Sequence, residues 1–169
     1  MSLKRLAIGA VAGGLTAGVL DLFAAMITYE IPMPTVMKSI AAGVLGPAAF
    51  DGGPGVAALG AGLHLFIAVT AAAIYAAAAQ GFPPIARRPL VFGPLFGIGI
   101  YTVMNYLVVP LSAAPFKPPA GDMMIKGLLV HMLVVGLPIA LIVSRSLREA
   151  GPGRAPSTTR STAGGPPSP

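Results

Sequence analysis

Four long apolar stretches dominate the sequence and limit the folds that the chain can adopt. They cover about residues 6–28, 56–79, 90–111 and 124–144, and the first is interrupted only by Asp21. An α-helix needs about 20 apolar residues to cross the hydrocarbon core of a bilayer. Only helices and closed barrels satisfy their backbone polar groups there, and these stretches have helical length. The sequence therefore predicts an all-α fold, a four-helix transmembrane bundle.

The composition excludes an ordinary soluble domain. Hydrophobic residues make up 55% of the 169 residues and charged residues only 9%, and the mean hydropathy is +0.82. Soluble domains carry roughly 25% charged residues, enough to cover a surface that faces water. The sequence contains no cysteine, which excludes disulfides and thiolate metal sites. We therefore expect the lipid bilayer to be the main partner.

The basic residues predict the orientation of the four spans. One set flanks the start of the first span, the loop between the second and third, and the end of the fourth: Lys4, Arg5, Arg87, Arg88, Arg145 and Arg148. On the other side lysines and acids offset one another: Lys38, Lys117 and Lys126 against Glu30, Asp51 and Asp122. Because arginine and lysine favour cytoplasmic loops, we expect a bacterial inner-membrane protein with both termini in the cytoplasm. The net charge of +6 is scattered in this way, which predicts no nucleic-acid partner.

Two segments lie outside the spans. Residues 35–50 are apolar but too short to cross the membrane, and Pro34 and the DGGPG turn at 51–55 bound them. This pattern predicts a short outer interfacial helix. Residues 150–169 are rich in glycine, proline, serine and threonine, which predicts a disordered cytoplasmic tail. The chain is thus expected to form a four-span domain, 1–149, and a tail, 150–169.

Small residues recur at helical spacing within the spans. The first span carries two GxxxG pairs on adjacent faces and the third begins with another: Gly9 with Gly13, Gly14 with Gly18, and Gly93 with Gly97. Helices in lipid associate by close backbone approach at such residues. We expect them to pack the bundle within one chain. The alternative is that the first span forms a dimer with a second copy.

Each span contributes one strongly polar side chain at a similar depth: Asp21, His64, Asn105 and His131. At 1.5 Å rise per residue, all four lie roughly 9–12 Å below the outer ends of their helices. Each also shares a helical face with glycine or alanine, for example Asp21 with Gly18 and His131 with Gly127. If these faces turn inward, the four side chains form a polar intramembrane cluster, as ionisable groups in membranes usually do.

The cluster has a functional and a structural interpretation. For Asn105, a hydrogen bond that only fixes the packing is the preferred one. For Asp21 with two histidines both stay open, since such a group titrates near neutral pH. Tyr101 either extends the polar path or fills a packing face. Glu30 and Lys38 are expected near the outer surface, exposed to solvent.

The order of these features resembles that of the YagU-like family of bacterial inner-membrane proteins. The matching pieces, over roughly residues 6–146, are a Gly/Ala-rich first span, the outer segment SIAAGVLGPAAF, a second span with a histidine and AAIY, NYLVVPL in the third and GLLVHMLVVGLPIAL in the fourth. The chain has Asn105 where that family typically has a histidine. The resemblance implies the same inner-membrane topology and no established reaction.

No nucleotide-binding loop, HExxH motif, serine nucleophile with a base, or carboxylate pair is found in the sequence. We therefore expect a transport, proton-linked or accessory-subunit role without a cofactor, with the chain acting as a homo-oligomer or in a larger membrane complex. One alternative is a b-type haem protein with His64 and His131 as axial ligands. A second is an intramembrane enzyme acting on lipid, with His64 or His131 as the general base oriented by Asp21.

Overall fold

Four long helices make up most of the structure, a computed structural model that describes residues 3–148. These residues form helices and no strands, and four helices are long and apolar enough to cross a membrane: Leu3–Tyr29, Pro54–Gly81, Pro89–Leu111 and Gly121–Arg148. The prediction of an all-α protein with four long apolar helices is confirmed. The predicted tail, 150–169, lies outside the described residues, as does the last residue of the expected 1–149 domain.

The spans are built from the following elements. The first span is α1 (Leu3–Tyr29) and the second is α3 (Pro54–Gly81). Between them lie α2 (Met33–Leu45) and the 3₁₀ segment η1 (Gly46–Asp51), and α3 is followed by the short α4 (Pro83–Arg87). The third span comprises α5 (Pro89–Val103), the π-helical η2 (Met104–Val108) and α6 (Val109–Leu111). The fourth comprises α7 (Gly121–Val130), the π-helical η3 (His131–Gly136) and α8 (Leu137–Arg148).

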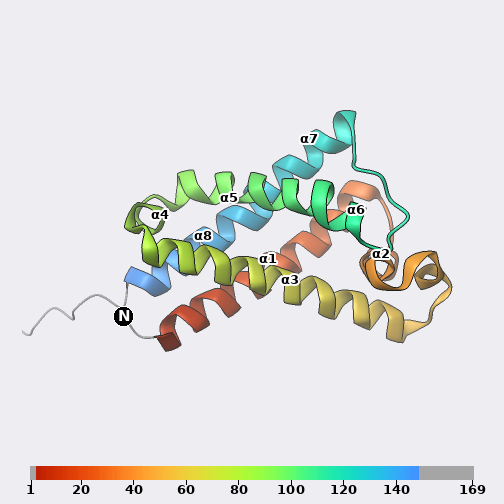
Figure 1. Cartoon of the computed structure of the whole chain (residues 1–169), viewed down its shortest axis with the longest axis horizontal. Coiled ribbons are helices and arrows are strands. Elements are labelled where there is room, and N and C mark those ends of the chain that lie inside the picture. The colour runs from red at the N-terminus through yellow and green to blue at the C-terminus, as the bar shows by residue number, and fades with distance from the viewer. Residues whose placement is uncertain (1–2, 149–169) are drawn as a thin grey trace, which may run out of the picture.

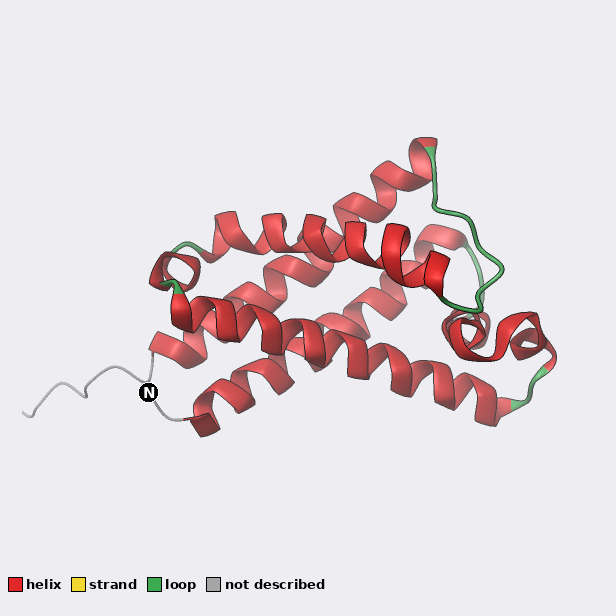
Figure 2. Ribbon diagram, in the orientation of Figure 1, coloured by secondary structure: helices red, strands yellow, loops and turns green. Residues whose placement is uncertain are grey.

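Successive spans run in opposite directions. The start of α1, α4 and the end of α8 lie at one end of the bundle, and α2 and the start of α7 lie at the other (Figure 1). The longest loop joins α6 to α7 at this second end (Figure 2). At the first end Arg148 Nη2 donates a hydrogen bond to the Ala86 carbonyl at 2.9 Å, tying the last span to α4. The basic flanks of the chain therefore gather at one end, called here the basic end.

The first span packs on two neighbours through its two glycine pairs. Gly9 and Gly13 face the fourth span, where a Cβ on Gly9 would lie 2.9 Å from the Ser146 Cβ. Gly14 and Gly18 face α3, and a Cβ on Gly14 would overlap the backbone of Val69. Both glycine faces of α1 are therefore covered by other spans of the same chain.

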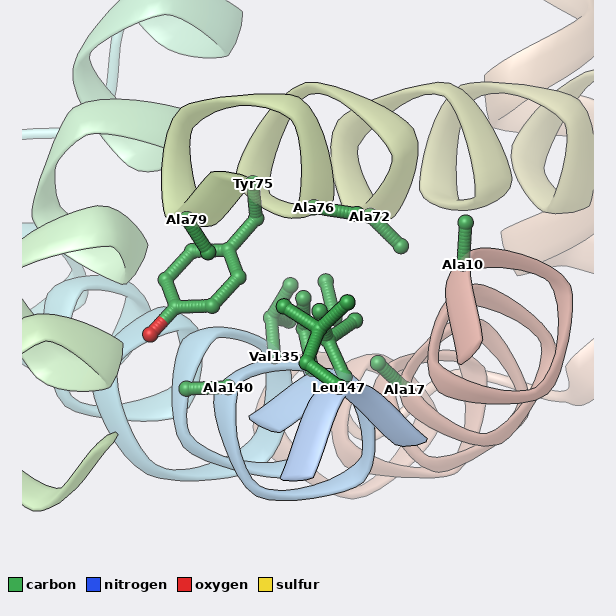
Figure 3. Close-up of a cluster of buried hydrophobic side chains, with 11 residues drawn as sticks. Ala10, Ala17, Ala72, Tyr75, Ala76, Ala79, Val135, Ala140 and Leu147 are labelled. Carbon is green, nitrogen blue, oxygen red and sulfur yellow. The ribbon is translucent and has the colours of Figure 1, made fainter. Parts of the chain in front are cut away.

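A compact apolar core fills the half of the bundle near the basic end. Alanines of α1 and α3 meet larger side chains of the fourth span, of which Ile139 and Val143 are fully buried. Figure 3 shows the members of this cluster: Ala10, Ala17, Ala72, Tyr75, Ala76, Ala79, Val135, Ala140 and Leu147 among them. The Tyr75 hydroxyl donates to the Ile85 carbonyl of α4 at 3.3 Å. This core leaves the opposite half of the bundle for the polar residues.

The third span packs on the fourth and not closely on the second. A Cβ on Gly93 would lie 2.9 Å from the Ala140 Cβ, and a Cβ on Gly97 would overlap the carbonyl group of His131. In contrast, α3 packs mainly on α1, α2 and α8, and it meets α5 through side chains such as the ring pair Tyr75–Phe96, with centroids 5.1 Å apart. The spans are therefore packed in the order second, first, fourth, third, which leaves a seam between the second and third.

Both π-helical segments precede a proline by two residues. Pro110 follows η2 and Pro138 follows η3. A proline has no backbone N–H and its ring crowds the carbonyl four residues earlier, so the regular α-helical ladder cannot continue through it. Widening to π geometry is one way for a helix to adjust, and such segments occur often at functional sites. Hydropathy alone did not predict these two interruptions.

Helix α2 is docked on the bundle. Ala41 and Ala42 are fully buried, and Gly60 of α3 approaches the Met37 carbonyl so closely that no Cβ would fit. Glu30, with φ of +54°, ends α1 and turns the chain toward α2. The helical segment that was predicted for residues 35–50 is therefore a short α-helix that continues as a 3₁₀ turn.

Gly97 offers a test of the packing between the third and fourth spans. We expect Gly97→Ala to lower the unfolding temperature in detergent, because overpacking costs about 1–3 kcal/mol. Alanine is otherwise preferred to glycine in a helix by about 1 kcal/mol. Gly99→Ala is the matched control, since nothing lies within 4 Å of a Cβ there. Equal unfolding temperatures for the two variants would contradict the close approach.

Candidate functional site

The four polar residues predicted to share one depth line a single cavity of about 210 Å³. It lies between all four spans, between the apolar core and the end of the bundle at which α2 lies, and is called here the inner cavity. Its remaining walls are apolar or small: Gly18, Ile40, Ile67, Ala68, Ala71, Ile100, Met104 and Val135. The structure thus brings Asp21, His64, Asn105 and His131 together around one space.

Asp21 and His64 form the closest pair in this cluster. His64 Nε2 lies 3.6 Å from Asp21 Oδ2, and both side chains are largely buried, 17% and 16% exposed. His64 Nε2 also lies 3.0 Å from the Gly18 carbonyl oxygen. A carbonyl only accepts, so Nε2 carries the proton and donates it there. In the neutral ring Nδ1 is then left as an acceptor. The backbone carbonyl therefore lies closer to Nε2 than the carboxylate of Asp21 does.

His131 is oriented by its own helix. Its Nδ1 lies 2.8 Å from the Gly127 carbonyl oxygen, one turn earlier, so Nδ1 carries the proton and Nε2 is the acceptor of the neutral ring. The Tyr101 ring packs edge-on against the imidazole, with centroids 5.3 Å apart and an interplanar angle of 78°. The two histidines are therefore held in opposite tautomers, each by a backbone carbonyl.

The hydrogen bond of the Asn105 side chain lies within its own span. Its Nδ2 donates to the Tyr101 carbonyl at 3.0 Å, within the third span, which leaves the amide oxygen as an acceptor. Tyr101 is 4% exposed, and its hydroxyl is buried without a hydrogen-bond partner. It packs beside the cavity and lines neither of the two cavities described here, so it fills a packing face.

A second cavity, of about 200 Å³, leads from the cluster toward the end of α1 that is followed by α2. It is called here the outer cavity, because it lies nearer to that end of the bundle. It shares Asp21, His64 and His131 with the first cavity. Its wall then continues over Thr28 and Tyr29 at the end of α1. Polar groups of three spans therefore line both spaces, which together extend from the middle of the bundle toward the end at which α2 lies.

The other polar residues singled out from the sequence lie apart from the cluster. Glu30 is exposed at the turn after α1. Lys38 donates from Nζ to the Phe50 carbonyl at 3.1 Å, which ties α2 to η1. Neither side chain lines the two cavities.

Several contributors to the site carried no signal in the sequence. The carbonyls of Gly18 and Gly127 orient the two imidazoles. Ile40 of α2 lines both cavities, although it lies 24 residues before His64 in a helix expected at the surface. Backbone acceptors and an apolar residue from a docked helix are invisible to motif searches, because only the tertiary packing brings them to the cluster.

A b-type haem does not fit this arrangement. His64 directs Nε2 at a backbone carbonyl, and the two cavities, about 210 and 200 Å³, are smaller than the roughly 300–1,000 Å³ of pockets for drug-sized ligands. Within residues 3–148 no three His, Asp or Glu side chains are grouped closely enough for one metal ion. The geometry therefore favours neither the haem interpretation nor a metal centre.

The interpretation as a lipid-acting enzyme requires a nucleophile that is hydrogen-bonded to its base, and the described residues that line the two cavities do not provide one. His64 and Asp21 provide a base with a carboxylate, and Ser39 lines the outer cavity with them. However, the Ser39 hydroxyl donates to the Val36 carbonyl at 2.7 Å, which engages it within its own helix. A nucleophile needs a hydrogen bond to its base, and none joins Ser39 to His64.

Comparison of the chain with models of protein families, with curated proteins and with solved structures finds no match. The function is therefore inferred from the geometry and chemistry of the two cavities.

The opposite tautomers of the histidines can be tested directly, because the chain contains only two. In protein labelled with ¹⁵N-histidine and held at a pH where both rings are neutral, NMR should show one ring protonated at Nε2 and the other at Nδ1. His131→Gln should remove the Nδ1-protonated set and thereby assign both. The same tautomer in both rings would contradict the backbone hydrogen bonds described above.

Proposed function

We propose that this chain is a small multi-pass protein of a bacterial inner membrane with a proton-linked transport role and no covalent chemistry of its own. The observation that carries the proposal is the Asp21–His64 pair, 3.6 Å apart, which shares a membrane-buried cavity with His131. Buried ionisable groups in a span are costly and typical of ion and proton pathways. A carboxylate and an imidazole are both groups that can take up and release a proton.

The surroundings of the pair support this role. None of the described residues that line the two cavities is a lysine or an arginine, so no permanent cation neutralises Asp21 there. Its charge must then be balanced by a proton on itself, a proton on an imidazole, or a bound cation. The outer cavity offers a route by which a proton reaches the pair from the end of the bundle at which α2 lies.

The proposed topology has both termini in the cytoplasm and α2 at the outer interface. The gathering of the basic flanks at one end of the bundle supports it, since arginine and lysine favour the cytoplasmic side. At the opposite end Phe50 and Phe116 pack edge-on with centroids 6.2 Å apart, which ties η1 to the loop between α6 and α7. The layout shared with the YagU-like family is part of the same proposal.

Four spans are few for a transporter built from repeats. The proposal therefore includes assembly, either as a homo-oligomer or as an accessory subunit of a larger membrane complex. Support comes from large side chains exposed on the second and third spans, such as Phe66 at 69% and Leu95 at 55%, which suit either lipid or a partner helix.

Reporter fusions test the topology. A reporter inserted beside Arg88 should give a signal only if it is one that works in the cytoplasm. A reporter inserted at Gly53 should give a signal only if it is one that works outside, because the two loops lie at opposite ends of the bundle. Alkaline phosphatase and green fluorescent protein provide the two readouts. Both reporters on the same side would contradict the topology.

A pH gradient across liposomes tests the function. Wild-type protein should dissipate the gradient, followed by a pH-sensitive dye inside, at least tenfold faster than empty liposomes. Asp21→Asn, which keeps the shape of the side chain but cannot carry the charge, should reduce the rate to that of empty liposomes.

Thr70→Val is the matched control for this assay. The Thr70 hydroxyl is exposed on α3 and donates to its own helix at the Phe66 carbonyl, 2.8 Å away, so its loss should leave the rate unchanged. Wild-type protein no faster than empty liposomes, or Asp21→Asn as fast as wild type, would overturn the proposal.

A further inference from the structure

The polar residues of the inner cavity are of two kinds. In three of them a side-chain N–H group donates a hydrogen bond to a backbone carbonyl, and the fourth, Asp21, has no N–H group in its side chain. His64 donates from Nε2 to Gly18, His131 from Nδ1 to Gly127, and Asn105 from Nδ2 to Tyr101. The ring nitrogens left over and the Asn105 oxygen are acceptors, and the Asp21 carboxylate is an acceptor only. Against these acceptors stands the second N–H of the Asn105 amide. The cavity is therefore rich in acceptors.

Such a cavity selects a ligand that donates hydrogen bonds and carries positive charge. Asp21 is the one carboxylate among the described residues that line it, and no lysine or arginine lines it. A buried polar group without a partner is unfavourable, so unpaired acceptors gain from a donor. We propose that the two cavities bind a small organic ammonium ion, whose N–H groups meet Asp21, His64 and His131.

An ammonium fits better than a bare metal ion. Metal ions need several ligands in one tight shell, and within the described residues no three such side chains are grouped closely enough. An ammonium nitrogen with an attached alkyl group is larger, and its N–H groups point in separate directions. Acceptors contributed by several spans around a cavity of about 210 Å³ suit such a ligand.

The alkyl part of the ligand has a place along the seam between the second and third spans. A groove of about 290 Å³ lies there and shares Ile40, Ile67 and Met104 with the inner cavity. Two serines also line it, but Ser39 donates to the Val36 carbonyl and Ser112 to the Val109 carbonyl, at 2.7 and 2.8 Å. With those hydroxyls engaged, the groove presents mainly apolar surface, which suits an alkyl chain.

Ile40 lies where the three spaces meet, since it lines the outer cavity, the inner cavity and the groove. The ligand class is therefore a primary alkylammonium with its nitrogen at the polar cluster and its chain past Ile40. This inference deepens the proposed function by naming the solute, and it rests on the same cluster.

Titration of ¹⁵N-histidine-labelled protein in nanodiscs with propylammonium chloride tests the inference at fixed pH and ionic strength. We expect saturable shifts of both histidine signals. Tetramethylammonium, a cation without N–H groups, and propionate, an anion of similar size, should cause none. Absence of a saturable shift with propylammonium, or an equal shift with tetramethylammonium, would overturn the inference.

Variants locate the binding site. Asp21→Asn should weaken propylammonium binding by about tenfold or more, because hydrogen bonds to charged groups are the stronger ones. Ile40→Phe should weaken binding of butylammonium more than of methylammonium, since it fills the junction with the groove. Thr70→Val should bind as wild type does. Unchanged affinity in Asp21→Asn would overturn the inference, as would an equal effect of Ile40→Phe on both amines.

The outcome is separable from that of the pH-gradient assay. Binding of propylammonium without any dissipation of the gradient would retain the ammonium site and reject the transport role. Dissipation that depends on Asp21, without propylammonium binding, would do the reverse.

Discussion

Close approach of main chains at glycine is the interaction on which this bundle depends. In lipid there is little hydrophobic drive between helices, so dispersion contacts and interhelical hydrogen bonds hold them together. Gly14 lies against the backbone of Val69, Gly97 against that of His131, and Gly60 against Met37. These three contacts join the first span to the second, the third to the fourth, and helix α2 to the second. A side chain at any of them would force the helices apart.

The same close approach creates the polar site. Because α1 and α3 meet at glycine, the Gly18 carbonyl comes within 3.0 Å of His64 and fixes its tautomer. Because the third span meets the fourth at Gly97, the Tyr101 ring packs on the His131 imidazole. Backbone acceptors, not other side chains, therefore orient both histidines. The acid, the two imidazoles and the amide are left to share a space that none of them fills.

The two halves of the bundle differ in packing and in polarity. Near the basic end, alanines and branched side chains pack without polar groups apart from Tyr75, which bonds to α4, and the buried Ser144. In the half nearer to α2, two cavities and a groove meet at Ile40, and the π-helical segments interrupt the regular ladders of the third and fourth spans. The packing there leaves space between the helices, whereas the apolar core keeps the four helices together.

The sequence by itself determined the helical class, the four long apolar helices and the depth of the polar residues, because hydropathy and helical rise depend only on local residue order. It also identified the glycine pairs. Only the tertiary structure decided which helix each glycine faces, because adjacent faces of α1 meet different partners, α3 and the fourth span. The tautomers of His64 and His131, the inward position of Ile40 and the bond of Asn105 to its own helix likewise depended on packing. Local sequence cannot specify them, since each depends on a backbone carbonyl or a cavity wall whose place is set by the packing of the helices.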